Sequence, residues 1–364
     1  MKTDERSRGV AVVTGGSAGI GRACVREFAR AGFDVAIIAR GRAGLEAAAS
    51  EVRELGRRAL PVEADVADDG AVFAAAARIE RDLGDIDVWV NNAMTTTFAP
   101  VQDVEPPDFA RAVDVTFLGQ VWGTMAALDR MRPRDRGAIV NIGSALAFVG
   151  IPLQSAYCAS KFACRGFFES TRAELIHQGS GIRLSMVHMP AVDTPQFGWC
   201  KTTMHRHPQP VPPIYEPERV ATHVVATAMN GRRSRVVGSW NRMLVAIGSV
   251  VPGYANHFAA VGAWATQLTD RPLDPDRPVN LRDPADDDRD AGSRGIFSSR
   301  SGGVLDPGFL ASLPGTAATF GRAGIGYARD RMGSFRRTRS SEQFRAVACV
   351  AGAALALGAW RRAG

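Results

Sequence analysis

The chemistry of this sequence centres on a tyrosine and a lysine in the segment YCASK, which supplies Tyr157 and Lys161. On a helix, residues four positions apart lie on the same face, so the two side chains would be neighbours. A lysine ammonium near a phenol lowers the pKa of the tyrosine from about 10 toward neutrality. Such a tyrosine can act as a general acid or base. Because this pair is also common on ordinary helices, it needs a wider context.

Two further observations single out the pair. Lysine occurs only three times among 44 basic residues, so a lysine at position 161 calls for a chemical reason. Ser144 lies 13 residues before Tyr157, at the end of a predicted strand. Ligands of open parallel sheets bind at the carboxyl ends of the strands. Ser144, Tyr157 and Lys161 are therefore candidates for a catalytic group at this edge of the sheet.

A glycine-rich turn, TGGSAGIG (Thr14–Gly21), lies between a predicted strand and a predicted helix. Glycine lets the backbone turn sharply and approach a pyrophosphate, while the helix N-terminus offers free N–H groups and a positive dipole end. The pattern indicates a nucleotide-binding loop. The alternative is a tight turn without a ligand, because a glycine-rich turn alone is a weak signal.

The end of the second predicted strand bears on which nucleotide binds. An acid there would hydrogen-bond the ribose 2′-OH of NAD and repel a 2′-phosphate. Ala39 is not acidic, and Arg40 and Arg42 can pair with a phosphate in bidentate fashion. The sequence therefore favours NADP(H) over NAD(H), unless Arg40 is a solvated surface arginine.

The elements that must position these residues alternate between apolar strands and helices. The expected strands are Val10–Gly15, Asp34–Ala39, Ala59–Val66, Ile86–Ala93, Ala138–Ser144, Ile182–Met189 and Arg235–Gly238. The expected helices are Ile20–Ala31, Gly44–Leu55, Asp69–Leu83, Pro107–Met131, Ser155–His177 and Pro217–Met229. Apolar strands alternating with helices indicate a parallel sheet between two helical layers. The predicted class is α/β, a doubly wound sheet of about seven strands.

This alternation stops near residue 240, which predicts a catalytic domain, residues 1–240, and a C-terminal extension, residues 241–364. Met243–Leu268 is apolar and helix-compatible, broken at Pro252, and could join a dimer interface or a membrane surface. Thr269–Arg300 is rich in Asp, Pro and Arg and is expected to be an irregular linker or wrapping segment. We expect a homo-oligomer.

Composition and charge limit location and partners. Five cysteines without a CxxC pair fit free thiols in a reducing compartment, so a cytoplasmic protein is expected. The net charge of +7 resides in Gly321–Gly364, which contains nine arginines and two acids. The uncharged run Ala346–Trp360 is shorter than the about 20 residues that span a membrane. It could be a short tail anchor, an interfacial helix or a helix packed on the core, and an anionic membrane surface is favoured over nucleic acid.

Together these residues resemble the short-chain dehydrogenase/reductase family over about residues 8–240. The motifs that match in order and spacing are TGGSAGIG, Asp65-Val66, Asn91–Ala93, Ser144, YCASK and Pro190–Thr194. The resemblance implies a Rossmann-type fold. It also implies hydride transfer between a nicotinamide and a substrate carbon.

The resemblance implies roles for individual residues. Tyr157 would donate or accept a proton at a carbonyl or alcohol, and Ser144 would donate a hydrogen bond to the substrate oxygen. Lys161 would hold the nicotinamide ribose and tune Tyr157. The residues implied to bind the cofactor are Gly15, Ser17, Gly19, Ile20, Gly21, Arg40, Asp65, Val66, Asn92, Ala93, Tyr157, Lys161, Pro190, Val192 and Thr194.

Three positions depart from the family pattern. Met94 and Ala191 each replace a glycine, and Thr116 stands where the family usually has asparagine. That asparagine is thought to hold a water that relays protons from the lysine. Thr116 can hydrogen-bond one water but has no amide, so we expect weakened catalysis or a rerouted relay and include Thr116 among the catalytic candidates. The second hypothesis is a catalytically weakened nucleotide-binding scaffold, associated with a membrane through its tail.

Apolar side chains are expected to line the substrate pocket: Met94, Leu146, Phe148 and Trp199, with Phe98, Met189, Phe197 and Met204 as further candidates. An apolar cleft with few polar groups suits a lipophilic carbonyl or alcohol. The alternative is ordinary packing of the loop Asp193–Ile214 over the core. On that loop, Cys200, His205 and His207 lack a fourth fixed ligand, so no metal site is predicted.

Overall fold

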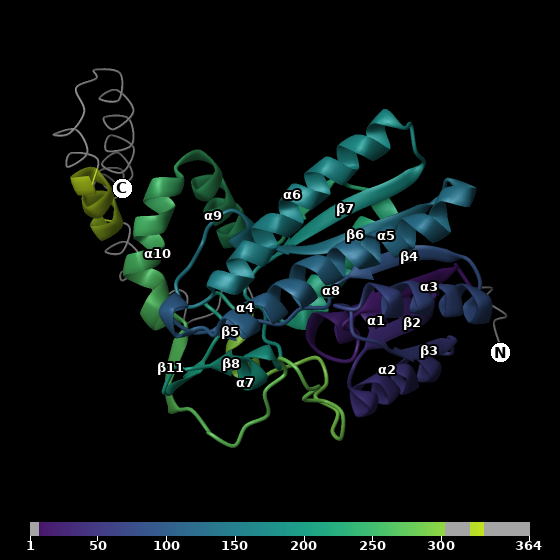
Figure 1. Cartoon of the computed structure of the whole chain (residues 1–364), viewed down its shortest axis with the longest axis horizontal. Helices are drawn as coiled ribbons and strands as arrows, with labels where there is room; N and C mark the ends of the chain where they lie inside the picture. The colour runs from purple at the N-terminus through teal and green to yellow at the C-terminus, as the bar shows by residue number, and fades with distance from the viewer. Residues whose placement is uncertain (1–6, 303–320, 331–364) are drawn as a thin grey trace.

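The computed structural model describes residues 7–302 and 321–330. Its centre is a parallel sheet of seven strands in the order β10-β7-β6-β4-β1-β2-β3 (Figure 1). The strands are β1 Val10–Thr14, β2 Asp34–Ala39, β3 Ala59–Glu63, β4 Ile86–Asn91, β6 Gly137–Ser144, β7 Ile182–Met189 and β10 Ser234–Val236. The chain winds outward in both directions from β1, so the predicted doubly wound sheet is confirmed. The switch point between β1 and β4 is where such sheets bind ligands.

Helices cover both faces of the sheet because its strands are apolar on both sides. One face packs against α1 Gly19–Arg30, α2 Arg42–Glu54 and α8 Pro217–Asn230. The other face packs against α3 Asp69–Leu83, α5 Gly119–Met131 and α6 Ser155–His177. Every residue of β1 and β2 is buried, as expected for strands between two helical layers.

The segment predicted as one long helix, Pro107–Met131, is divided in the structure. It consists of α4 Pro106–Val113, a turn of π-helix at Asp114–Leu118, and α5. The extra residue of a π-turn shifts the following side chains around the helix axis, and such turns often occur at functional sites. Here the π-turn carries Thr116.

The apolar part of the C-terminal extension forms two helices, α9 Ser239–Val250 and α10 Pro252–Thr266. Proline fits the first turn of a helix but breaks its interior, so the break predicted at Pro252 is confirmed. After α10, β11 Leu268–Pro272 pairs with β9 Arg206–Pro208. Of the predicted irregular segment Thr269–Arg300, residues 273–297 are irregular and run back toward α1 and α2 (Figure 1). The prediction is wrong at the two ends, because residues 269–272 belong to β11 and Ser298–Arg300 form a short 3-10 helix.

A second small sheet joins β5 Thr97–Phe98 to β8 Lys201–Thr202. The sequence analysis predicts neither small sheet, because strands of two to five residues are too short to show a hydrophobic alternation. Both sheets tie loops together near the carboxyl edge of the main sheet.

Within residues 7–302 and 321–330, no helix has the length and apolar character needed to cross a membrane. The run Ala346–Trp360 lies outside the described residues. Its predicted association with a membrane therefore stays a prediction, as does the homo-oligomer.

An ionic cluster at the start of β2 supports a stability prediction. Asp34 is 2% exposed and accepts hydrogen bonds from Arg58 Nε at 2.8 Å and Arg57 Nη2 at 3.2 Å. Burial raises the pKa of Asp34, but the hydrogen bonds from Arg58 and the two positive charges outweigh it, so the pKa lies below its usual range. Asp34→Asn is expected to lower the free energy of unfolding by about 2–4 kcal/mol near pH 7, measured by urea denaturation.

The lowered pKa of Asp34 also predicts how the stability difference between the wild type and Asp34→Asn changes with pH. A lowered carboxyl pKa stabilises the fold above the pKa of the unfolded chain, and this contribution is lost as the pH falls through the folded pKa. The difference between the wild type and Asp34→Asn should therefore shrink in acid. Glu46→Gln is the control, because its pair with Arg53 is exposed and should change stability by less than about 0.5 kcal/mol. Equal losses in both variants would contradict the prediction.

Candidate active site

The glycine-rich turn after β1 packs tightly against the loop after β4. Gly15 has a φ of +63°, and a Cβ at this position would lie 2.7 Å from Ala93 Cα. A Cβ at Gly21 would lie 2.0 Å from the Gly15 carbonyl oxygen. Thr14 Oγ1 accepts hydrogen bonds from the N–H groups of Asn92 and Ala93 at 3.0 and 3.1 Å. Glycine is therefore required for this turn to reach the N-terminus of α1.

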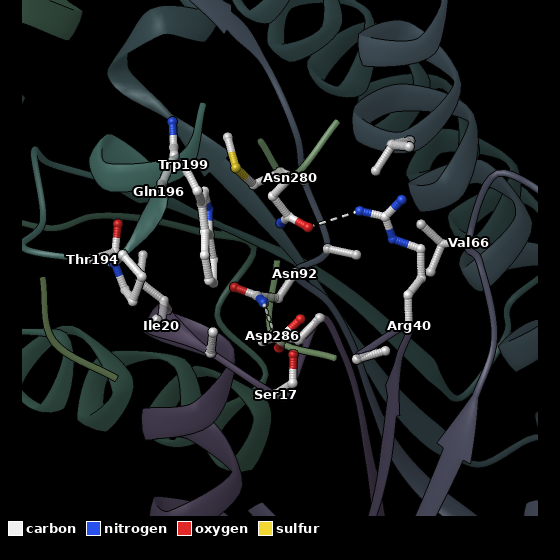
Figure 2. Close-up of a pocket in the computed structure, with 18 of the residues that line it drawn as sticks. Ser17, Ile20, Arg40, Val66, Asn92, Thr194, Gln196, Trp199, Asn280 and Asp286 are labelled. Atoms are coloured by element: carbon white, nitrogen blue, oxygen red, sulfur yellow. Dashed lines mark hydrogen bonds between the residues drawn. The ribbon is translucent and has the colours of Figure 1, made fainter. Parts of the chain in front are cut away.

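A cavity of about 150 Å³ lies along this turn, at the switch point of the sheet (Figure 2). It is lined by ten of the predicted cofactor-binding residues: Gly15, Ser17, Gly19, Ile20, Arg40, Asp65, Val66, Asn92, Ala93 and Thr194. These residues come from the ends of four neighbouring strands and from the loop after β7. A crevice at the carboxyl ends of parallel strands, beside a helix N-terminus, fits the phosphates and ribose of a dinucleotide.

A larger cavity of about 590 Å³ adjoins the first and contains the predicted catalytic residues. Five residues line both cavities: Ile20, Asn92, Met94, Thr194 and Gln196. Ser144, Tyr157 and Lys161 line the larger cavity, as do Pro190 and Val192. The structure thus brings the predicted catalytic group and the predicted cofactor site together.

The catalytic candidates are held by their neighbours. Lys161 is 3% exposed, and its Nζ donates a hydrogen bond to the Ile142 carbonyl oxygen at 2.7 Å. The same Nζ lies 5.6 Å from the centre of the Tyr157 ring. Ser144 Oγ accepts a hydrogen bond from the Leu146 N–H at 3.1 Å, which orients the hydroxyl.

The expected lowering of the tyrosine pKa is wrong. Burial raises the pKa of Tyr157 well above its usual range, and the hydrogen bond with Ser144 only partly opposes this effect. Burial also lowers the pKa of Lys161. The low-polarity surroundings therefore disfavour the charged form of both groups, an effect that the spacing of two residues on a helix cannot reveal.

Thr116 is placed differently from what its proposed relay role requires. Its Oγ1 donates a hydrogen bond to the Thr95 carbonyl oxygen at 2.7 Å and accepts one from the Thr95 N–H at 3.0 Å. The one hydroxyl proton of Thr116 is therefore used in the hydrogen bond to the Thr95 carbonyl oxygen. From any further partner, Oγ1 can only accept a hydrogen bond. Through these two hydrogen bonds, Thr116 links the loop after β4 to the π-turn.

The predicted substrate residues divide among four places. Met94 and Leu146 line the larger cavity, as do the further candidates Met189 and Phe197. Trp199 lines the smaller cavity, while Phe148 packs against the His188 ring and the Arg165 guanidinium, outside both linings. Phe98 and Met204 belong to a small apolar cluster.

The roof of the larger cavity is not predicted from the sequence; Trp240, Leu244 and Phe258 of α9 and α10 contribute to it. The apolar stretch Met243–Leu268 is visible in the sequence, but from the sequence alone its apolar surface is expected to join a dimer interface or a membrane surface. Also not predicted are Asn280 and Asp286, which line the smaller cavity (Figure 2). No sequence pattern near these two residues indicates a site, because they reach the cavity through a long irregular segment.

No metal site is predicted for the loop that carries Cys200, His205 and His207. Burial raises the pKa of the Cys200 thiol to about 11, which disfavours the thiolate that binds metals. The part of the chain that the structure describes contains no group of three or more His, Cys, Asp or Glu side chains arranged to hold a metal ion.

Comparison with known proteins shows which family this chain is similar to. Residues 9–203 match the family described as short chain dehydrogenase. The chain is 32% identical to "Uncharacterized oxidoreductase YxnA" of Bacillus subtilis (strain 168), over 80% of this chain and 83% of that protein. It is 29% identical to "Estradiol 17-beta-dehydrogenase 11" of Mus musculus, over 67% of this chain and 80% of that protein.

A third relative is "3-dehydrosphinganine reductase" of Danio rerio, which is 30% identical over 65% of this chain and 73% of that protein. The family match covers more than half of the chain, and it includes both the glycine-rich turn and the helix that carries Tyr157 and Lys161. The protein is an oxidoreductase of the short-chain dehydrogenase/reductase family.

Proposed function

We propose that this protein transfers hydride between a nicotinamide cofactor and a large lipophilic alcohol or carbonyl compound, with Tyr157 as the general acid or base. One observation carries the proposal: Ser144, Tyr157 and Lys161 share a mostly apolar cavity of about 590 Å³ that adjoins the cavity at the glycine-rich turn. A site with this lining binds an apolar molecule and orients it through a few polar groups.

Each catalytic side chain has a distinct task in carbonyl reduction. Ser144 donates a hydrogen bond to the substrate oxygen, and Tyr157 gives that oxygen a proton as negative charge develops on it. Lys161 Nζ lies 5.6 Å from the centre of the Tyr157 ring, so in its ammonium form it would stabilise the phenolate that Tyr157 becomes, although burial opposes that form. The cofactor, when bound, supplies the hydride. In the reverse direction, Tyr157 removes the proton from the alcohol.

The substrate class follows from the roof and walls of the larger cavity. Met94, Leu146, Trp240 and Phe258 offer apolar surface to a substrate much larger than a short alcohol. The names of the relatives, an estradiol dehydrogenase and a 3-dehydrosphinganine reductase, support a lipid-like substrate.

For the cofactor we propose NADP(H), as the sequence predicts. Arg40 lines the smaller cavity at the end of β2, where a positive charge favours the 2′-phosphate, and Ala39, the last residue of β2, is not acidic. We expect tighter binding of NADPH than of NADH in a fluorescence titration, with NADPH binding about tenfold weaker in Arg40→Ala. Arg53→Ala is the matched control, because Arg53 is an exposed arginine of α2 away from the cavity. If a folded sample binds neither nucleotide, the proposal fails.

The placement of Thr116 supports a second candidate, the weakened nucleotide-binding scaffold. The Thr116 hydroxyl proton is engaged by the Thr95 carbonyl oxygen, so Thr116 cannot donate a hydrogen bond to a relay water. Such a protein would bind the nucleotide but turn over no member of a broad panel of lipophilic carbonyl compounds, before or after Thr116→Asn. Turnover by the wild type excludes it.

A further inference from the structure

The C-terminal extension returns to the cofactor site through residues 279–290, which we name the strap. Its backbone and side chains engage the arginine that we assign to the 2′-phosphate. Arg40 Nη2 donates a hydrogen bond to Asn280 Oδ1 at 2.9 Å (Figure 2). Arg40 Nη1 donates to the carbonyl oxygens of Leu281 and Arg282. The strap therefore takes up donors that a phosphate would need.

The strap also covers the N-terminus of α2, the second group of donors at this end of the cavity. The Ala43 N–H donates to the Asp287 carbonyl oxygen at 3.0 Å, and the Gly44 N–H donates to the Asp286 carbonyl oxygen at 3.1 Å. The Arg42 N–H donates to Asp287 Oδ1 at 3.0 Å. Helix N-termini bind anions because their N–H groups are unpaired, and here strap oxygens pair with them.

Asp286 is the residue of the strap that enters the cavity. It is 4% exposed, and its Oδ2 has no hydrogen-bond partner among the residues that the structure describes. A Cβ at Gly44 would lie 2.4 Å from this Oδ2 and 2.9 Å from Ser17 Cβ, so the carboxylate lies against the glycine-rich turn (Figure 2). A buried carboxylate oxygen without a donor is unfavourable, so a ligand group that donates a hydrogen bond would be held there.

Glycine at position 41 allows this approach. Its backbone has an ordinary φ of −78°, so the conformation itself does not require glycine. A Cβ would, however, lie 2.1 Å from Asp286 Oδ1. The β2–α2 connection is thus shaped to admit the acidic side chain, although the two are more than 240 residues apart in sequence.

We propose that Asp286 is a determinant of cofactor specificity, supplied by the C-terminal extension. In this fold an acid at the end of β2 accepts a hydrogen bond from the ribose 2′-OH, but here β2 ends at Ala39 and is followed by Arg40. Asp286 supplies this acid from the strap. Its carboxylate accepts a hydrogen bond from the ribose 2′-OH and repels a 2′-phosphate. With the strap in this position, the preference for NADP(H) is therefore weaker than the one that Arg40 alone would give. This inference rests on the proposed function, since it requires a nicotinamide cofactor at this site.

The test compares the dissociation constants of NADPH and NADH, measured by fluorescence titration of the full-length protein. In Asp286→Asn and Asp286→Ala, the Kd of NADPH is expected to fall about tenfold, while the Kd of NADH stays constant or rises. The ratio of the two constants should therefore shift at least about tenfold toward NADPH. Asp288→Asn is the matched control, because it removes the same charge from an exposed position of the strap and should leave the ratio unchanged.

Two outcomes would overturn the inference. One is a ratio that changes by less than about twofold in both Asp286 variants, with both nucleotides still bound and the thermal unfolding temperature unchanged. The other is an equal shift in Asp288→Asn, which would mean a general effect of charge. Failure of the wild type and of every variant to bind either nucleotide would instead overturn the proposed function, and this inference with it.

Discussion

Replacing Tyr157 with phenylalanine is expected to reduce kcat/KM for the carbonyl substrate at least about 1000-fold, while the Kd of the nucleotide stays within about twofold of the wild type. The variant removes one oxygen, the atom that carries the transferred proton. The phenyl ring keeps the packing of α6, so the fold and the cavity should persist. Stopped-flow turnover and a fluorescence titration on the same sample measure the two effects separately.

The control for Tyr157→Phe is Tyr254→Phe, which removes a phenol from α10 outside the lining of both cavities. It should leave kcat/KM within about threefold of the wild type. Substantial turnover by Tyr157→Phe would mean that another group supplies the proton. Loss of nucleotide binding would mean that the variant has disturbed the site as a whole.

The raised pKa of Tyr157 predicts different pH profiles for the two reaction directions. Carbonyl reduction needs the protonated phenol, and a raised pKa keeps the phenol protonated through neutral and mildly alkaline pH. The rate constant for reduction should therefore be nearly constant between about pH 6 and pH 9. Alcohol oxidation needs the phenolate, so its rate should rise across this range. A plateau of oxidation near neutral pH would show that the pKa is lowered in the working enzyme.

The main sheet and most of the candidate site could be predicted from local patterns. The apolar runs that form β1, β4 and β6 are buried on both faces, and the residues that follow them belong to motifs of fixed spacing. Gly15 follows β1, Asn92 follows β4 and Ser144 ends β6, and parallel strands end at one edge of the sheet. The structure places them along two adjoining cavities.

The parts that could not be predicted depend on contacts between distant residues. Asp286 reaches Gly44 from more than 240 positions away, and no hydrophobic period or turn signal marks the segment that carries it. The apolar stretch that forms α9 and α10 is visible in the sequence, but its partner is not. Likewise, Thr116 can be identified as a departure from the family pattern, whereas its bond to Thr95 requires the π-turn.

The second large effect is expected at Lys161. In this chain arginine is the usual basic residue, yet a lysine occupies a site that is 3% exposed. A guanidinium is larger and planar, and it cannot repeat the single contact of Nζ with the Ile142 carbonyl oxygen without moving α6 away from β6. We therefore expect Lys161→Arg to reduce kcat/KM about 100-fold or more, close to the loss in Lys161→Met, although only the arginine keeps the charge.

Lys201→Arg provides the matched control, since Lys201 is partly exposed and forms an ion pair with Asp108 that an arginine can replace. It should retain activity within about threefold of the wild type. If Lys161→Arg also retained such activity, a positive charge of any shape would suffice, and the position of Nζ would carry no chemical role. If Lys161→Arg fails while it still folds, the site requires an ammonium at one point beneath Tyr157, which is the reason a lysine stands in a chain that otherwise uses arginine.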